Sequence, residues 1–258
     1  MAGRSPTRPL LLLVLGAALL LPAPALGAQW HPHIRSAISY IHHRAGDIRF
    51  QVRYGDRRWG YHATRIVRSA SVVKAMLLVA YLDDPRVRHR RLREEDSELI
   101  DPMIERSDNG AASRVLAFVG PARVRTVAHR AHMRRFTLNP VYWGGSQIDA
   151  DDQAGFFLHI DKLVVPKHRW AALHLLASVT PEQRWGVGRI KHHGWHLYFK
   201  GGWGSGTGLV DHQVALFTRG TQRVSVAVLT TANPNHEYGK ETLRGVFARL
   251  LHTFPHSG

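Results

Sequence analysis

Two kinds of hydrophobic spacing alternate along this chain and predict its secondary structure. Apolar residues recur at every second position over residues 47–54 and 57–63, which predicts two strands joined as a hairpin through Gly55 and Asp56. The same period returns toward the other end of the chain. There it predicts three more strands, over residues 196–203, 210–219 and 223–231, with a hairpin turn over residues 219–222.

Helical spacing fills the interval between these two groups of strands. Proline residues such as Pro121 and Pro166 fall where the predicted helices begin or end. The predicted helices cover residues 72–82, 94–105, 110–119, 122–131, 149–163 and 167–179, and two more, over 36–44 and 240–254, flank the strands. Residues 134–148 have no clear period and are expected to form a long loop, a kind of segment that is often functional.

This order of elements predicts an α+β fold with three layers, α/β/α. One antiparallel five-stranded sheet is assembled from both chain ends, and an all-helical domain is inserted between its strands. We expect residues 29–68 and 186–258 to form the sheet domain and residues 69–185 to form the helical domain.

The first 28 residues differ in character from the rest. Arg4 and Arg8 precede an apolar run over residues 10–21, and small residues and prolines follow over residues 22–28. This is the pattern of a secretory signal peptide, and the apolar run is shorter than the about 20 residues that span a bilayer. We therefore expect a bacterial protein that is secreted or periplasmic and associated with the cell wall, with no membrane attachment once the signal is removed.

Composition excludes several classes of function. The chain of 258 residues has no cysteine, which rules out disulfides, cysteine-ligated metals and a thiol nucleophile. Its formal charge of +16 suits anionic cell-wall polymers as partners of an exported protein, and no module typical of nucleic-acid binding is present. The 18 histidines lack metal-ligand spacing, so neither a metal nor a cofactor is expected.

Ser71 and Lys74 stand one turn apart at the start of a predicted helix. The free N–H groups and the dipole of a helix N-terminus favour negative charge developing on a serine oxygen. The same field disfavours a protonated ammonium, and a lysine that acts as a base must be neutral. The two residues are a candidate nucleophile and base, although a helix cap beside a surface cation has the same spacing.

A second group, Ser107-Asp108-Asn109, directly precedes the predicted helix over residues 110–119. All three residue types are favoured as helix caps, so capping alone accounts for their position. The functional interpretation gives Ser107 a proton-shuttling hydroxyl and gives Asn109 an amide that holds both Lys74 and a substrate carbonyl.

The third group is Lys200-Gly201-Gly202-Trp203, on a predicted strand. Consecutive glycines mark either an ordinary turn or a place where another backbone approaches closely. In the second case an extended substrate pairs with the strand, and Lys200 supplies a fixed positive charge for the substrate carboxylate.

Taken together and in this order, the three groups resemble the motifs of the serine β-lactamase and penicillin-binding superfamily, most closely the class A β-lactamase catalytic domain. Those motifs are Ser-x-x-Lys, Ser-Asp-Asn and Lys-Thr-Gly. The resemblance covers essentially the whole chain after the leader. It implies that Ser71 is the nucleophile, Lys74 the base and Ser107 the proton shuttle. It also implies that the backbone N–H groups of Ser71 and Trp203 form the oxyanion hole.

One departure concerns the deacylation step. Class A enzymes carry a glutamate that activates the deacylating water, whereas no glutamate occurs here between Glu105 and Glu182. Its place falls at Trp143 or at Arg135, depending on which motif anchors the count. The nearest carboxylates suit the acidic first turn of the next helix better than a catalytic role; these are Asp149, Asp151 and Asp152.

A second departure concerns the substrate carboxylate. Gly201 stands where the family has a threonine, so one hydroxyl is missing. The arginine that the family often carries on the following strand is absent, and Asp211-His212-Gln213 occupies this place.

The favoured hypothesis is an exported serine hydrolase that forms an acyl-enzyme at Ser71 on a β-lactam, a D-alanyl peptide or a related amide or ester, without efficient turnover of β-lactams. The alternative is a penicillin-binding-like, non-turnover protein that binds the cell wall and retains the pocket. A more remote third is a basic polyanion-binding protein whose site is vestigial.

Overall fold

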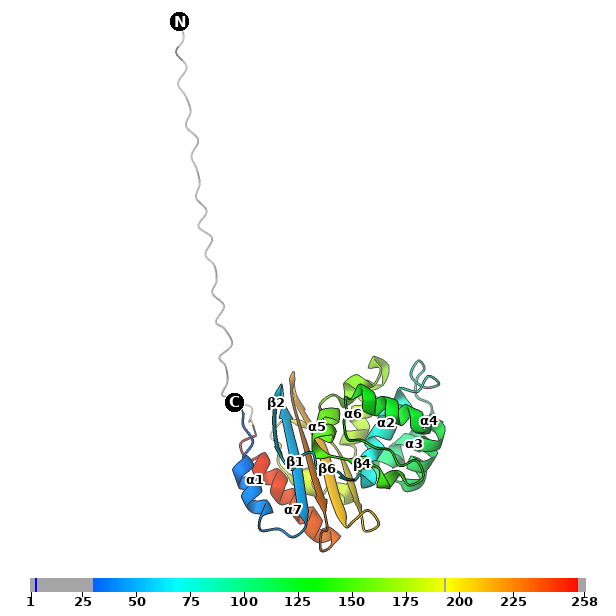
Figure 1. Cartoon of the computed structure of the whole chain (residues 1–258). Coiled ribbons are helices and arrows are strands. Elements are labelled where there is room, and N and C mark those ends of the chain that lie inside the picture. Colours follow the sequence, from blue (N-terminus) through cyan, green and yellow to red (C-terminus); the bar gives the residue numbers. More distant parts are fainter. Residues whose placement is uncertain (1–2, 4–29, 193, 255–258) are drawn as a thin grey trace.

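A central antiparallel sheet with helices on both faces organises the molecule (Figure 1). The computed structural model describes residue 3 and residues 30–192 and 194–254. Apart from residue 3, the signal peptide expected over residues 1–28 lies outside this part of the chain. Within it, every helix is too short or too polar to cross a bilayer.

The sheet confirms the prediction that both chain ends contribute strands. Its order is β2-β1-β7-β6-β5, and neighbouring strands are antiparallel. The strands are β1 Asp47–Tyr54, β2 Arg57–Tyr61, β5 His196–Gly204, β6 Val210–Arg219 and β7 Gln222–Thr231. Strand β5 lies at one edge, so its outer side is open to the segment that carries Ser71.

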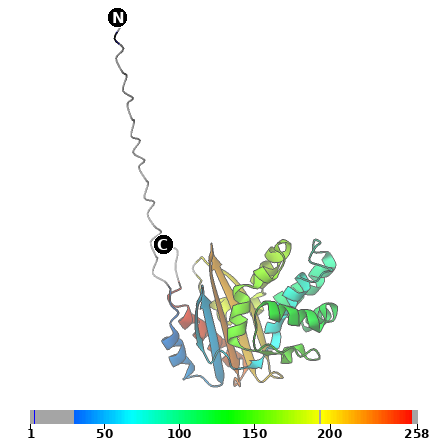
Figure 2. The same cartoon turned by 45° about the horizontal axis from the view of Figure 1, so that its top comes forward.

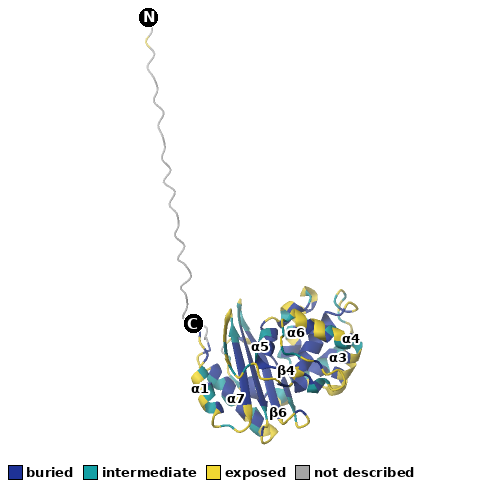
Figure 3. Ribbon diagram, in the orientation of Figure 1, coloured by how far each residue is buried: buried dark blue, intermediate teal, exposed yellow. Residues whose placement is uncertain are grey.

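Alternation along β1 decides which residues face which helical layer. Phe50 and Val52 pack with α1 (Ile34–Ile41) and α7 (His236–Leu250), in a core that also includes Phe247. Arg53, one residue further, points to the opposite face and pairs with Asp151 at 2.6 Å. Figure 3 shows the result, a buried sheet between two helical layers that are exposed on their outer sides.

The larger helical layer covers the other face and is seen from a second angle in Figure 2. Its centre is α2 (Lys74–Leu82), in which every residue is buried. The apolar run of α2 therefore reflects burial on all sides. Around it lie α3 Glu94–Glu105, α4 Asn109–Arg130, α5 Ala150–Leu158 and α6 Arg169–Ala177.

Some boundaries differ from the sequence prediction. The helices expected over residues 110–119 and 122–131 adjoin in α4 across a kink, where Gly120 has a φ of 74° and Pro121 follows. Helix α7 begins at His236, four residues earlier than expected, because Asn235 caps it by accepting a hydrogen bond from the Tyr238 backbone N–H.

The interval 134–148 is more ordered than a loop. It contains β4 (Gln147–Ile148), which pairs with β3 (Val67–Arg68) just before Ser71.

The short 3-10 turns are η1 Ala70–Val73, η2 Trp143–Gly145, η3 Ile160–Leu163, η4 Pro166–His168, η5 Pro181–Gln183 and η6 Gly186–Arg189. The proposed division into a sheet domain and a helical domain stays a prediction.

Candidate active site

Ser71 lies in the 3-10 turn η1, which leads directly into α2. The residue before it, Ala70, has a φ of 44°, a left-handed conformation that is costly for a residue with a Cβ. Backbone strain of this kind persists where the surrounding structure enforces it and is concentrated at functional sites. Ser71 is 8% exposed, so little of the residue contacts solvent.

Lys74 begins α2 and points its amine into the protein. Its side chain is fully buried, and Nζ donates to the backbone oxygen and the Oγ of Ser107 (3.1 Å to Oγ) and to Asn109 Oδ1 at 2.8 Å. Burial lowers the pKa of Lys74 to about 7, against the opposing effect of the nearby Asp108 carboxylate. Among the described residues no hydrogen bond joins Lys74 to the Ser71 hydroxyl, so the amine is held by the second motif rather than by the serine.

Ser107 is the point at which the three motifs meet. Its Oγ accepts hydrogen bonds from Lys74 Nζ at 3.1 Å and from Lys200 Nζ at 3.0 Å. Its φ of 58° is a second strained backbone position at the site. With both amines donating to the oxygen, the Ser107 hydroxyl proton is free for a third partner.

The capping and functional interpretations of the second motif both hold, for different residues. Asp108 caps α4 by accepting a hydrogen bond from the Ala111 backbone N–H at 2.6 Å. Ser107 and Asn109 do not cap the helix, and their side chains accept hydrogen bonds from Lys74. Sequence alone did not divide these roles.

Lys200 comes from β5, 93 residues from Ser107 in sequence. It is fully buried, and its amine also donates to the Gly201 oxygen at 2.9 Å. Burial, reinforced by the charge of Lys74, holds the pKa of Lys200 well below its usual range. The two buried amines share one hydroxyl, so they titrate as a coupled pair.

Gly202 brings β5 against the backbone of the serine turn. A Cβ at this position would lie 2.8 Å from the backbone nitrogens of both Ser71 and Val72, so only glycine fits. This close approach brings the strand that carries Trp203 against the Ser71 amide, as an oxyanion hole made by those two backbone N–H groups requires.

Gly201 faces the other side of the sheet. A Cβ there would lie 3.1 Å from the Trp185 ring, so the indole takes the space next to this position. Trp185 also meets the rings of Trp203 and His236 edge-on, at 5.9 and 5.6 Å between centroids. An aromatic cluster therefore adjoins the position where the family places a threonine.

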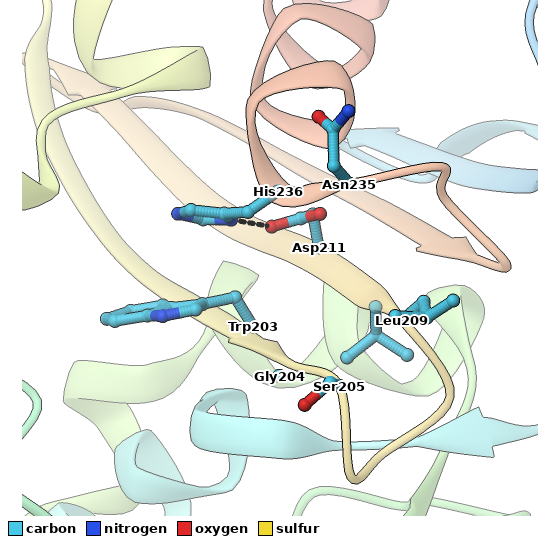
Figure 4. A pocket seen from close by; sticks show the side chains of 8 residues that line it. Trp203, Gly204, Ser205, Leu209, Asp211, Asn235 and His236 are labelled. Carbon is cyan, nitrogen blue, oxygen red and sulfur yellow. Dashed lines mark hydrogen bonds and ion pairs between the residues drawn. The ribbon is translucent and has the colours of Figure 1, made fainter.

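Figure 4 shows the neighbouring pocket of about 250 Å³, at the end of β5. The rings of Trp203 and His236 are stacked, 5.8 Å apart and 24° from parallel. His236 Nδ1 lies 2.5 Å from the Asp211 carboxylate, which is buried. Burial raises the pKa of Asp211 to about 6, while the hydrogen bond from His236 acts in the opposite direction.

Trp143 occupies the space over Lys74. The centre of its ring lies 4.8 Å from Lys74 Nζ, and its indole N–H donates to Ser113 Oγ at 3.1 Å. Of the two places that the sequence left open for the family's glutamate, only this one faces the amine, since Arg135 pairs with Asp149 at 3.2 Å. The cation–π contact itself was missed, because no local signal in the sequence predicts it.

The three aspartates that follow Trp143 in sequence have structural roles. Asp149 caps α5, and Asp151 pairs with Arg53. Asp152 accepts hydrogen bonds from the backbone N–H groups of Arg134 and Arg135, at 2.8 and 2.7 Å. In the described part of the chain no cluster of three or more His, Asp or Glu side chains could hold a metal.

Solved structures share this architecture at low sequence identity. The β-lactamase of Sphaerobacter thermophilus DSM 20745 superposes with a TM-score of 0.73 at 20% identity, over 85% of this chain and 96% of that one. An ancestral class A β-lactamase (GNCA) gives 0.73 at 17%, over 86% and 100%. A mutant of PBP-A, in an acyl-enzyme complex with penicillin G, gives 0.70 at 16%, over 86% and 96%.

No curated protein matches the chain. The model of the Beta-lactamase2 family, described as the beta-lactamase enzyme family, matches residues 96–254, which is more than half of the sequence. With the sheet order and the three motifs in place, the chain belongs to the beta-lactamase enzyme family and has its serine hydrolase fold.

Proposed function

We propose that this protein is a serine hydrolase that acylates itself at Ser71 and releases the acyl group slowly. One observation carries the proposal: Lys74 is a fully buried amine with a pKa lowered to about 7, held one turn from the serine. Such an amine is partly neutral at physiological pH and accepts a proton.

In the acylation step the Ser71 Oγ–H proton passes to neutral Lys74, and the oxygen attacks the substrate carbonyl. The oxyanion that forms accepts hydrogen bonds from the backbone N–H groups of Ser71 and Trp203. The Ser107 hydroxyl then gives its proton to the leaving nitrogen or oxygen and recovers one from the Lys74 ammonium. The balance is one acyl–enzyme ester formed and one amide or ester bond broken.

Deacylation lacks an evident base. The Trp143 ring covers Lys74 where the family's glutamate would stand, and Asp149, Asp151 and Asp152 are engaged in capping and pairing. An indole does not activate water. This arrangement supports a long-lived acyl-enzyme. It equally supports the second candidate function, a penicillin-binding-like, non-turnover protein that binds the cell wall and retains the pocket.

The substrate class is a β-lactam, a D-alanyl peptide or a related amide or ester. The open edge of β5 suits an extended, peptide-like substrate. Lys200 lies on the same strand, but its amine is buried and its pKa is held well below the usual range, so it is not a permanent positive charge for a substrate carboxylate. Gly201 supplies no hydroxyl for that carboxylate. Export and association with anionic wall polymers remain part of the proposal and follow from the leader and the charge of +16.

Labelling with a fluorescent penicillin, followed on denaturing gels and by intact mass, tests the proposal. We expect wild type to gain one covalent label that persists after excess reagent is removed. Ser71→Ala should gain none, while Ser97→Ala on α3 serves as the matched control. A label that decays as hydrolysed product appears would establish turnover. No label, with ester cleavage equal in wild type and Ser71→Ala, would refute an acylating serine.

A further inference from the structure

A separate cavity, lined mainly by charged and polar residues, lies away from the serine, between the end of α1, the start of β1 and the turn after β2. Its volume is about 230 Å³. None of Ser71, Lys74, Ser107 or Lys200 lines it. Nothing in the proposed reaction uses this cavity.

Arg49 forms the buried wall of the cavity. Its side chain is 8% exposed, and its Nε is buried without a hydrogen-bond partner among the described residues. Its remaining contacts are long: Nη1 donates to the Asp47 backbone oxygen at 3.3 Å and to Thr231 Oγ1 at 3.2 Å. A buried guanidinium with an unsatisfied N–H is costly unless an acceptor completes its shell.

Positive charge dominates the rest of the lining. Arg44 and Arg65 contribute two more guanidinium groups, and His42 and His62 contribute imidazoles. Arg65 is exposed and forms no side-chain hydrogen bond or ion pair in the described part of the chain. Burial lowers the pKa of Arg49; the Asp47 carboxylate opposes this shift, and the charge of Arg65 adds a smaller lowering effect.

The one carboxylate of the lining does not neutralise this charge. Asp47 lies 3.7 Å from Arg49 Nη2 and its side chain is 65% exposed, so solvent screens it. Arg44 is already engaged: it stacks on the Tyr238 ring at 3.6 Å and donates to Thr242 Oγ1. Arg49 and Arg65 are therefore the cations left for a ligand.

We propose that this cavity binds a phosphate group, held between the guanidinium groups of Arg49 and Arg65. A phosphate offers several acceptor oxygens in the geometry that a guanidinium fork matches, and its charge balances two cations better than a monoanion does. His42 and His62 stand at the same cavity as additional donors. The phosphate is either free or carried by an anionic polymer.

Calorimetric titration of inorganic phosphate into the full-length protein, at constant ionic strength in chloride, tests the site. Wild type should bind with one-to-one stoichiometry. Arg49→Met and Arg65→Gln should each weaken binding by about tenfold or more, because each removes charge-assisted hydrogen bonds. Arg58→Gln changes an exposed arginine of β2 outside the cavity and should bind as wild type does.

Arg65→Gln keeps the test valid if Arg49→Met fails to fold, since Arg65 is exposed. Absence of binding to wild type would overturn the proposal. So would equal binding by wild type and Arg65→Gln, or by wild type and a folded Arg49→Met. A parallel titration with poly(glycerol phosphate) identifies the source: tighter binding per phosphate, lost in the same variants, indicates a polymer, and equal binding indicates the free ion. Penicillin labelling at Ser71 should be unchanged in all these variants.

Discussion

The titration of Lys74 should set the pH profile of acylation. The pKa of this amine is lowered from 10.5 to about 7 because the side chain is buried. Only the neutral amine takes the serine proton, so the acylation rate follows the neutral fraction. That fraction rises about ninefold from pH 5 to 6, about fivefold from pH 6 to 7 and less than twofold from pH 7 to 8.

The assay is the initial rate of labelling by fluorescent penicillin at subsaturating concentration, measured from pH 5 to pH 9. Lys74→Arg should lose acylation by about 10²-fold or more at every pH, because a guanidinium stays protonated. Lys162→Arg, at an exposed lysine, is the control and should match wild type. A rate that climbs tenfold per pH unit through pH 9, or equal rates in wild type and Lys74→Arg, would refute a lysine base with a lowered pKa. Because Lys74 and Lys200 share the Ser107 hydroxyl, the midpoint belongs to the pair.

Three further predictions concern the same site. Gly202→Ala should abolish labelling, since its Cβ would meet the Ser71 and Val72 backbone nitrogens at 2.8 Å, whereas Gly204→Ala meets only Thr207 Oγ1 at 3.2 Å and should label normally. Trp143→Glu should shorten the life of the acyl-enzyme. It should also move the acylation midpoint to higher pH by about 1 unit or more, because a carboxylate beside Lys74 favours the ammonium. Trp143→Phe should do neither, and a label equally stable in both variants would argue against this account. Finally, lowering the Lys74 pKa from 10.5 to about 7 destabilises the fold by up to about 5 kcal/mol below pH 7, and this cost disappears as the pH rises to 10.5. Urea unfolding should therefore show Lys74→Met most favoured over wild type at pH 6 and least at pH 10, and a pH-independent difference would contradict the assignment.

Local signals predicted the parts of the fold that depend on neighbours in sequence. The two-residue period placed β1 at residues 47–54, and the helical period placed α3 at residues 94–105, as the structure has them. Residues 134–148 gave no period, and the strand at their end, Gln147–Ile148, forms only by pairing with Val67 and Arg68, which are distant in sequence. The early start of α7 depends on one cap, which a periodicity argument does not weigh.

The sequence alone predicted the family and the candidate site. Its signals were the spacing of Ser71 and Lys74, the cap-like Ser107-Asp108-Asn109 and the paired glycines. Tertiary structure alone decided how the groups meet. It placed Lys200 on the Ser107 hydroxyl, held Lys74 by hydrogen bonds to the second motif, and laid the Trp143 ring over that amine. Burial is what lowers the pKa values of the two lysines, and burial is produced by segments far apart in the chain. A sequence can therefore supply an amine, but only the packed protein can make it a base.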